Sequence, residues 1–362
     1  MAFIIIVSIY CAMILVLLVG FRRLREPQGP ATIIHSISVV VPFRNEAQNL
    51  PALLRSLAEI KYPKWEIILV DDHSTDNYKL VSGGLNIRLI QSPGHGKKAA
   101  ITTAVQNSAS DIIVTTDADC LVGSRWLEKI NLAFQDPKIQ MMIGGVRIEE
   151  NETFFSRLQA LEFVSVAATG AGTLGLGFPT MCNGANLSYR RTAFMAVGGY
   201  QGNENISSGD DEALMNALKK TSKDSIAFLF SGDALVTTGP SATLKEFAGQ
   251  RLRWAGKWQS NISIQTRLFA MVVWLFHLAF ITMALSALAG FITWKLFIIL
   301  ASAKVFAEAL LLIPAAKFFR VKWRWISFFA LQFIYSFYVI CTGFLSQILL
   351  SGWKGRAVVK KV

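Results

Sequence analysis

The sequence contains few cysteines and few histidines, and neither residue type is clustered. There are four of each: Cys11, Cys120, Cys182 and Cys341, and His35, His73, His95 and His277. No Cys-x-x-Cys pair is present, and the histidines are scattered along the chain. The sequence therefore predicts neither a disulfide framework nor a zinc site.

Charged residues are also scarce, at 17% of the chain against 52% hydrophobic residues. This composition excludes intrinsic disorder and a purely cytosolic protein. The net charge of +12 is unevenly distributed, because residues 31–266 carry 22 basic and 22 acidic side chains while residues 267–362 carry 11 basic and one acidic. A nucleic-acid binder would carry its basic excess on the folded domain. We therefore expect a membrane, and no nucleic acid, as the partner.

Four long apolar segments predict membrane helices. Residues 1–21, 268–294 and 325–353 are uncharged, and residues 296–316 contain only Lys304 and Glu308 as charged residues. Each segment approaches or exceeds the roughly 20 residues that a spanning helix needs. No basic residue precedes the first segment and no small-residue cleavage site follows it, so we expect it to be retained. Lys304 and Glu308 are four residues apart, so they share one helical face and can pair there.

Basic residues beside these segments predict the orientation. Arg22, Arg23 and Arg25 favour an outside N-terminus and a cytosolic central domain, and the basic aromatic stretch 317–325 (KFFRVKWRW) favours cytosolic head groups. Three spans after residue 266 would nevertheless put the basic tail 354–362 outside. Either one apolar segment does not cross the membrane or the tail is an exception, and the sequence leaves both open.

Between residues 37 and 120, apolar runs alternate with helical patterns. The runs 37–41, 66–70 and 112–116 each end in polar residues, with a weaker run at 87–90, and helical patterns at 47–59 and 97–107 separate them. This alternation predicts an α/β domain with a mostly parallel sheet. Ligands of such sheets bind beyond the carboxyl ends of the strands, where these polar residues lie.

Two glycine patterns resemble nucleotide-binding loops without meeting their requirements. Gly170, Gly172 and Gly175 have G-x-G-x-x-G spacing, but a helical pattern precedes them in place of a strand, so we predict a mobile loop. The uncharged stretch 163–179 allows two alternatives. It could lie at the bilayer surface and admit an amphipathic acceptor, or it could be a buried helix and loop. The sequence before Lys97 lacks the first glycine of a P-loop, although a lysine near a donor phosphate remains possible.

Carboxylates follow two of the predicted strands. Asp117 and Asp119 come after the run 112–116, at a spacing that lets both bind one hard cation such as Mg2+ or Mn2+. Taken alone, the motif could equally be an acidic turn that is exposed to solvent and binds no metal. Asp71 and Asp72 end the preceding strand.

A second acidic cluster begins a helical pattern at Asp210, Asp211 and Glu212. The helix dipole favours acids at this position, but capping needs only one of them. The same dipole is expected to keep Asp211 ionised and able to accept a proton. Further along, Gln250, Arg253 and Trp254 share one face of a predicted helix, which Trp258 extends; an interfacial aromatic belt is the plainer alternative.

Seven motifs stand in this order: VPFRNE (41–46), LVDDHSTD (69–76), GHGKKAA (94–100), TTDADC (115–120), CNGANLSYRR (182–191), SGDDEAL (208–214) and QRLRW (250–254). With them the chain resembles a membrane-bound family 2 glycosyltransferase of GT-A fold, similar to ceramide glucosyltransferase-like and poly-N-acetylglucosamine synthase-like enzymes. The resemblance implies a Rossmann-like GT-A domain at 37–240, an interfacial helix at 241–266, about three membrane helices at 267–353 and a basic tail at 354–362. It also implies an integral protein of the inner (cytoplasmic) membrane with a cytosolic catalytic domain.

The resemblance assigns roles to particular residues. It implies that the donor is bound by Pro42, Arg44, Glu46, Asp71, Asp72, Lys97 and Asp117, that Asp117 and Asp119 hold the metal, that Asp211 is the catalytic base, and that Asp210, Gln250, Arg253 and Trp254 contact the acceptor or the diphosphate. One base and no protein nucleophile imply inversion at the anomeric carbon.

The implied activity is transfer of a sugar from a nucleotide-sugar, expected to be UDP-linked, to a hydroxyl of a membrane lipid or a lipid-linked saccharide, with Mn2+ or Mg2+. A processive polysaccharide synthase is the first alternative, although four apolar segments argue against a long polymer channel. The sequence has GDD at 209–211 where many members have a Glu-Asp pair. A metal-dependent nucleotidyltransferase and a non-catalytic membrane scaffold also stay open, since fold alone does not fix function.

Overall fold

The computed structural model describes residues 1–30, 32–80, 83–201, 210–221, 224–256, 264–348, 352–353 and 356–357. The chain forms two compact units. The first, here called the membrane unit, comprises residues 1–23, 150–180 and 240–351. The second, the sheet unit, comprises residues 24–149, 181–239 and 352–362. Each unit thus combines segments that are far apart in the sequence.

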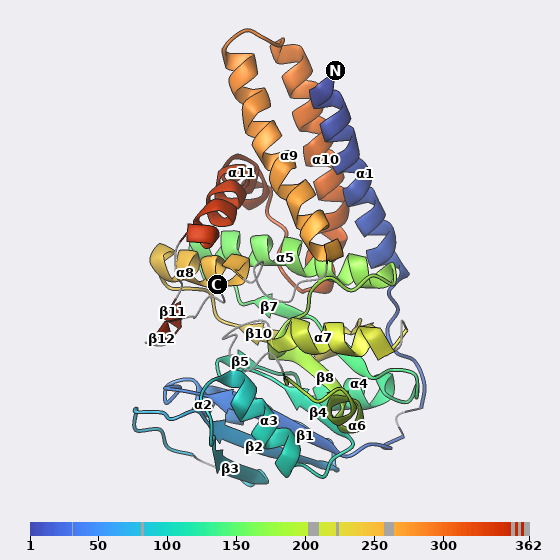
Figure 1. Cartoon of the computed structure of the whole chain (residues 1–362), viewed down its shortest axis with the longest axis vertical. Coiled ribbons are helices and arrows are strands. Elements are labelled where there is room, and N and C mark those ends of the chain that lie inside the picture. Colours follow the sequence, from blue (N-terminus) through green and yellow to red (C-terminus); the bar gives the residue numbers. More distant parts are fainter. Residues whose placement is uncertain are drawn as a thin grey trace. The chain divides into compact units, whose positions relative to one another are not determined.

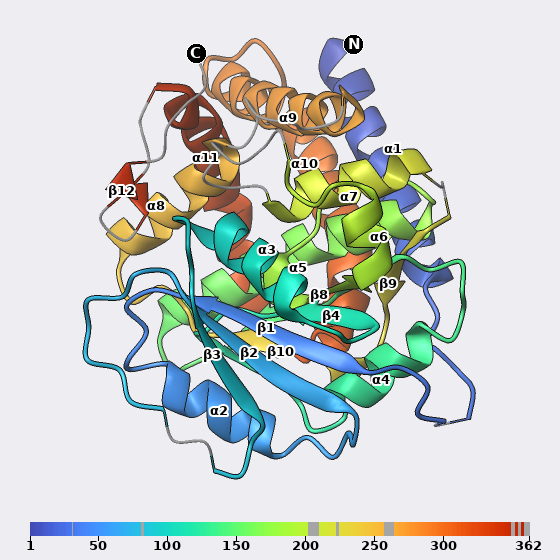
Figure 2. The same ribbon diagram turned by 60° about the horizontal axis from the view of Figure 1, so that its bottom comes forward.

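The sheet unit is built on a seven-stranded sheet with the strand order β3-β2-β1-β4-β8-β6-β9 (Figure 2). The strands are β1 (Ile37–Phe43), β2 (Trp65–Asp71), β3 (Ile87–Gln91), β4 (Ile112–Thr115), β6 (Met141–Gly144), β8 (Leu187–Arg190) and β9 (Ile226–Leu229). Strands β1 to β4 pair in parallel, whereas β8 is antiparallel to both of its neighbours and β6 is parallel to β9. The predicted α/β class with a mostly parallel sheet is confirmed.

A smaller three-stranded sheet combines β5 (Cys120–Leu121), β10 (Val236–Thr238) and β7 (Val146–Ile148). The helices of this unit are α2 (Leu50–Ala58), α3 (Lys97–Asn107), α4 (Trp126–Ala133), α6 (Arg191–Ala196) and α7 (Asp210–Thr221). Because α2 joins β1 to β2 and α3 joins β3 back to β4, right-handed crossovers put the two helices on opposite faces of the sheet (Figure 2). The central strands are buried on both faces, as their unbroken apolar runs require.

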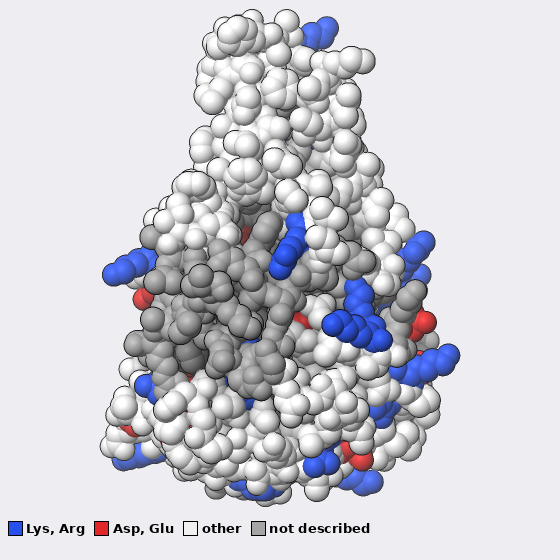
Figure 3. All heavy atoms as spheres, in the orientation of Figure 1, with Lys and Arg blue, Asp and Glu red and all other residues white. Residues whose placement is uncertain are grey.

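The membrane unit consists of helices α1 (Ala2–Arg23), α5 (Phe154–Gly175), α8 (Leu244–Ala255), α9 (Ile264–Leu288), α10 (Trp294–Phe318) and α11 (Trp325–Ile348) (Figure 1). Among the described residues, four of these helices are long and apolar enough to cross a membrane: α1, α9, α10 and α11. The face seen in Figure 3 is almost free of charged side chains over the bundle of α1, α9 and α10. These helices agree with the four predicted apolar segments.

Helix α5 corrects the prediction of a mobile loop at Gly170, Gly172 and Gly175. All three glycines lie in this helix, and two of them allow its backbone to touch that of α1. A Cβ at Gly172 would lie 2.7 Å from the carbonyl oxygen of Leu17, and one at Gly175 would lie 2.0 Å from that of Gly20. Figure 1 shows α5 crossing the ends of α1 and α10. The glycine spacing therefore serves helix packing, and residues 163–175 form a largely buried helix, as one of the two alternatives for 163–179 expects.

The predicted pair of Lys304 and Glu308 is confirmed inside α10. The Lys304 Nζ atom lies 2.9 Å from Glu308 Oε1, and both side chains are largely buried. Tyr10 of α1 donates a hydrogen bond to Glu308 Oε1 at 2.7 Å, and Gln332 of α11 donates to Glu308 Oε2 at 2.9 Å. The pair thus links three helices of the membrane unit.

Candidate active site

The two carboxylates of the Asp117-Ala118-Asp119 motif lie in the turn between β4 and β5. Although Asp119 is an exposed residue, the protein around its carboxylate restricts hydration, and this desolvation raises its pKa, with the charges of Asp117 and Glu46 adding to the effect. The smaller contributions from Asp117 and Glu46 reflect carboxylates that gather at this turn. A bound divalent cation would relieve that repulsion.

Lys97 forms an ion pair with Asp117 of this motif. It is the first residue of α3, after Gly96, whose φ of 91° is a conformation that favours glycine. Its Nζ atom lies 2.5 Å from Asp117 Oδ1. Both side chains keep partial access to solvent, at 24% and 39% exposure, so a ligand can reach this ion pair.

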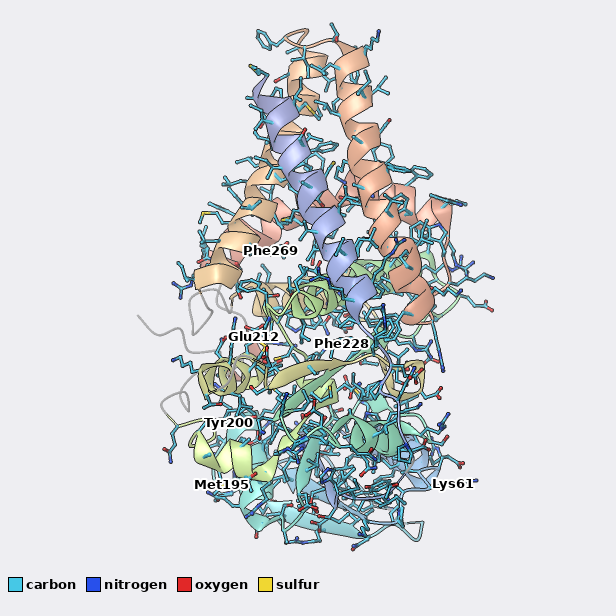
Figure 4. All side chains as sticks on the ribbon, turned by 90° about the vertical axis from the view of Figure 1, so that its right-hand side faces the viewer. Lys61, Met195, Tyr200, Glu212, Phe228 and Phe269 are labelled. Carbon is cyan, nitrogen blue, oxygen red and sulfur yellow. The ribbon has the colours of Figure 1, made fainter. Side chains whose placement is uncertain are left out.

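Asp211 lies at the start of α7, next to Glu212 (Figure 4), and is 7% exposed. One carboxylate oxygen accepts a hydrogen bond from the backbone N–H of Gly184 at 3.2 Å. The other accepts from the N–H of Glu212 at 2.9 Å. Two N–H donors suit an ionised carboxylate, which can only accept hydrogen bonds. They also fix the direction in which this carboxylate points.

Gly184 is the point at which these side chains meet. A Cβ atom at this glycine would lie 3.1 Å from Lys97 Nζ and 3.8 Å from Asp211 Cβ. The Gly184 carbonyl oxygen accepts a hydrogen bond from Thr115 Oγ1, at the end of β4, at 2.8 Å. The structure therefore brings Asp117, Lys97 and Asp211 together around one glycine, although they are spread over more than a hundred residues of sequence.

The predicted nucleoside-binding residues lie along the ends of β1 and β2. The Asp72 Oδ1 atom accepts a hydrogen bond from the Gly96 N–H at 2.9 Å, and Asp72 is 2% exposed. Arg44 Nη1 donates to the carbonyl oxygens of Asp72 and His73, both at 2.8 Å. These contacts join the loops after β1, β2 and β3 into one surface.

The other three predicted donor residues have more local surroundings. Asp71 accepts hydrogen bonds from the Ser74 N–H and the Tyr78 hydroxyl, so its carboxylate stabilises the turn after β2. Glu46 accepts from Asn49 Nδ2 at 2.6 Å. Pro42 lies within β1, paired in register with Val70. Their contact with a nucleoside stays a prediction.

Two of the histidines, which are scattered along the sequence, lie close together in the structure. The rings of His73 and His95 have centroids 4.3 Å apart. Together with Asp72 they offer ligand atoms that lie within 4.8 Å of one another. The 21 residues between the two histidines hid this cluster in the sequence, and only the pairing of β2 with β3 brings the two loops together.

Gln250, Arg253 and Trp254 lie on α8 of the membrane unit. The helix begins with a capping box in which Thr243 and Glu246 exchange hydrogen bonds. The predicted contacts of these three residues with diphosphate and acceptor stay predictions. Trp258 and the side chain of Asp210 lie outside the described residues.

Arg251 of α8 was not among the predicted site residues, but the structure gives it several buried contacts. Its guanidinium bonds both carboxylate oxygens of Glu162 from α5, and the two side chains are only 3% and 4% exposed. The guanidinium carbon also lies 4.3 Å from the ring centroid of Trp254 and 4.6 Å from that of Phe247. Tyr338 of α11 donates a further hydrogen bond to Glu162 Oε1 at 3.1 Å. In the sequence, Glu162 is a single acidic residue in an otherwise apolar stretch. This feature could have indicated that a buried basic partner exists.

Comparison with known proteins gives this arrangement a family. Residues 38–198, which contain β1 to β4, β8, Lys97, Asp117, Asp119 and Gly184, match the family model described as Glycosyl transferase family 2. The chain carries a glycosyl transferase family 2 domain. Asp211 and α8 lie beyond the matched residues.

Relatives of the family 2 domain are distant in sequence. The chain is 25% identical over 265 residues to the glycosyltransferase AglE of Haloferax volcanii, covering 66% of this chain and 79% of that protein. It is 24% identical over 239 residues to an N-acetylglucosaminyltransferase of Bradyrhizobium diazoefficiens, covering 62% of this chain and 49% of that one. A poly-beta-1,6-N-acetyl-D-glucosamine synthase of Staphylococcus aureus is 24% identical over 148 residues, which cover 39% of this chain and 36% of the synthase. The chain therefore spans about half or less of the two bacterial relatives.

A solved mannosyltransferase has a similar fold. The mannosyltransferase PcManGT from Pyrobaculum calidifontis, in complex with GDP-Man and Mn2+, superposes with a TM-score of 0.57 at 17% identity, covering 88% of this chain and 99% of that one. At this identity the likeness concerns the fold alone. The predicted GT-A-like fold is confirmed, and residues 38–198 match the predicted family as a domain, with membrane-length helices on both sides of it.

Proposed function

We propose that this protein is an inverting glycosyltransferase that moves a sugar from a nucleotide-sugar, expected to be UDP-linked, to a hydroxyl of a membrane lipid or a lipid-linked saccharide. The observation that carries the proposal is the arrangement around Gly184, where a buried carboxylate, Asp211, lies beside the cation Lys97 and the Asp117 carboxylate. A sugar transfer between oxygen atoms needs a base at the acceptor and positive charge at the leaving group.

In the proposed reaction, Asp211 accepts the proton of the acceptor hydroxyl as its oxygen forms a bond to the anomeric carbon. The bond from that carbon to the diphosphate breaks at the same time, and the nucleoside diphosphate leaves with its electron pair. A single displacement inverts the anomeric configuration. Lys97 stabilises the negative charge that grows on the diphosphate, since its Nζ atom already lies against a carboxylate of the donor site.

The carboxylates of Asp117 and Asp119 fit a divalent cation, because two carboxylates two residues apart stand in one turn with the charge of Glu46 close enough to act on Asp119. Bound there, Mn2+ or Mg2+ would supply Lewis-acid stabilisation of the diphosphate. The solved mannosyltransferase of similar fold contains Mn2+ and GDP-Man, which supports a metal-dependent reaction for this chain.

Several features support a membrane acceptor. Four described helices have the length and hydropathy of membrane spans, and α8 with Gln250, Arg253 and Trp254 belongs to the same unit as those helices. We place the protein in the inner (cytoplasmic) membrane with the family 2 domain in the cytosol, because basic residues follow α1. The named activity of the staphylococcal relative, a polysaccharide synthase, keeps a growing saccharide as the alternative acceptor.

The test is nucleoside-diphosphate release by membranes that contain the protein, over a panel of nucleotide-sugars with Mn2+ or Mg2+ and a native lipid extract. Asp211→Asn is expected to lower the rate by about 10²- to 10⁴-fold while donor binding persists. Asp136→Asn, at an exposed acid of the same unit, is the matched control. Release that persists unchanged in Asp211→Asn, or a product with retained anomeric configuration, would overturn the mechanism.

A further inference from the structure

Helix α11 differs from the other long apolar helices in its direction. Helices α1, α9 and α10 run side by side, whereas α11 lies across them, next to α5 and α8 (Figures 1 and 2). All of these helices belong to the membrane unit. A helix that lies across a bundle of spans does not have the direction of a span.

Helix α11 contacts α9 at two places. Ser336 of α11 bonds His277 of α9 at 3.0 Å, and a Cβ at Gly343 would lie 2.6 Å from the Trp274 ring. Between these two contacts the chain advances seven residues along α11, about 10 Å, but three residues along α9, about 4.5 Å. Beyond Gly343, α11 continues to α8, where a Cβ at Gly256 would lie 3.9 Å from the Ser346 carbonyl oxygen.

The side chains of α11 are divided between two faces. The large apolar residues of its outer face recur at helical spacing and are 47–78% exposed; they are Ile326, Phe329, Phe333, Phe337, Phe344 and Ile348. Residues outside this outer face bond the neighbouring helices, with Gln332, Ser336 and Tyr338 bonded to α10, α9 and α5. A helix that presents large apolar side chains outward is suited to contact with lipid.

Basic residues stand immediately before this helix. The segment between α10 and α11 contains Arg320, Lys322 and Arg324, after Lys317 in the last turn of α10, and Arg324 pairs with Glu150 at 3.6 Å. The helix itself contains no charged residue. Cationic groups beside an aromatic face match anionic head groups above acyl chains.

From this geometry we infer that α11 does not span the membrane but lies in its cytosolic interface, with its phenylalanine face in the lipid. The protein then has three spans, α1, α9 and α10. The basic tail 354–362 stays on the same side as Lys322, which removes the conflict with the positive-inside trend. The inference concerns membrane topology and holds whether or not the proposed catalytic activity does.

The first test compares the two ends of α11 by labelling of single cysteines with a membrane-impermeant maleimide. Lys322→Cys precedes the helix, Gly355→Cys follows it, and Phe291→Cys stands in the turn between α9 and α10. The four native cysteines are replaced, and the background must keep the parent's thermal unfolding. Positions 322 and 355 are expected to react only after permeabilisation, and position 291 in intact cells. Opposite reactivity of 322 and 355 would show a span and overturn the inference.

The second test measures depth. Cysteines at Phe329, Phe333, Phe337 and Phe344 carry a fluorophore, and the protein is placed in nanodiscs whose lipids bear quenchers at set positions of the acyl chain. An interfacial helix gives one shallow depth for all four sites. In a span, the 15 residues from 329 to 344 would cover about 22 Å of depth. Deepest quenching at Phe337, with shallower sites on both sides, would therefore contradict the inference.

Discussion

Gly184 is the residue on which the candidate site depends most closely. Its N–H holds Asp211, its carbonyl oxygen is held by Thr115, and the space that a side chain would fill is occupied by the ammonium group of Lys97. Gly184 lies within the motif CNGANLSYRR (182–191), but that motif assigned it no role. Its importance follows from the absence of a side chain at a crowded point.

Gly184→Ala is expected to disturb the site without unfolding the protein. The new methyl group would stand 3.1 Å from Lys97 Nζ, which must move away from Asp117 because it is the flexible end of its side chain. We expect kcat/KM for the donor to fall by about 10- to 100-fold. Gly239→Ala, where nothing lies within 4 Å of the new Cβ, is the control. Equal activity of the two variants would contradict the role of Gly184.

At the scale of elements, α8 is held by a buried ion pair. Arg251→Met would leave the Glu162 carboxylate buried without its partner, at a cost of about 3–5 kcal/mol. We expect a clearly lower midpoint of thermal unfolding in detergent, and partial recovery in Arg251→Met, Glu162→Leu. Arg251→Lys should recover little, because lysine lacks the two-pronged geometry.

Lys245→Met, on the exposed face of the same helix, is the control for this series and should leave unfolding unchanged. If Arg251→Met unfolds at the same temperature as this control, the pair with Glu162 does not anchor α8. A loss of activity in Arg251→Met without loss of stability would instead indicate a direct contact with substrate.

The crossing of α1 and α5 gives a second prediction for elements. A Cβ at Gly20 would lie 2.0 Å from the carbonyl oxygen of Gly172, and backbone cannot yield as a side chain can. Gly20→Ala is therefore expected to push the helices apart and lower the unfolding temperature. Gly249 is exposed on α8 and nothing lies near the position of its Cβ. Gly249→Ala should therefore raise the unfolding temperature, since alanine favours a helix by about 1 kcal/mol over glycine. Equal shifts would argue against a close helix crossing.

At the scale of the whole molecule, the buried group of Lys304, Glu308, Tyr10 and Gln332 joins the first helix of the chain to the last two. Glu308→Leu would leave the Lys304 charge, 1% exposed, with the Gln332 amide oxygen and the Phe280 ring but no carboxylate partner. We expect a loss of about 3–5 kcal/mol, seen as a lower unfolding temperature. Most of this lost stability should return in the double variant Lys304→Met, Glu308→Leu. A stable Glu308→Leu protein would show that this group contributes no stability.

Lys295→Met supplies the comparison for this set, because it removes an exposed lysine from the same helix. It should leave unfolding unchanged. Tyr10→Phe should have an intermediate effect of about 1.5–3 kcal/mol, since it removes one hydrogen bond to a charged group.

The elements of this protein were largely predictable. The strands β1, β2 and β4 and helix α3 follow apolar runs whose period and polar ends are local properties of the sequence. The membrane-length helices follow from hydropathy in the same way. The glycines of α5 were predicted wrongly, because their spacing fits both a loop and a helix crossing, and only the partner helix α1 distinguishes the two.

The sequence by itself determined the α/β class, the apolar helices, the family resemblance and the acidic candidates, because each of these depends on residues close together in the chain. The tertiary structure decided which of those residues meet. Lys97 faces Asp117, Asp211 is held by Gly184, and Arg251 is paired with Glu162 across 89 positions. The tertiary structure also decided the direction of α11, which hydropathy cannot show, since the same apolar residues suit a span and an interfacial helix.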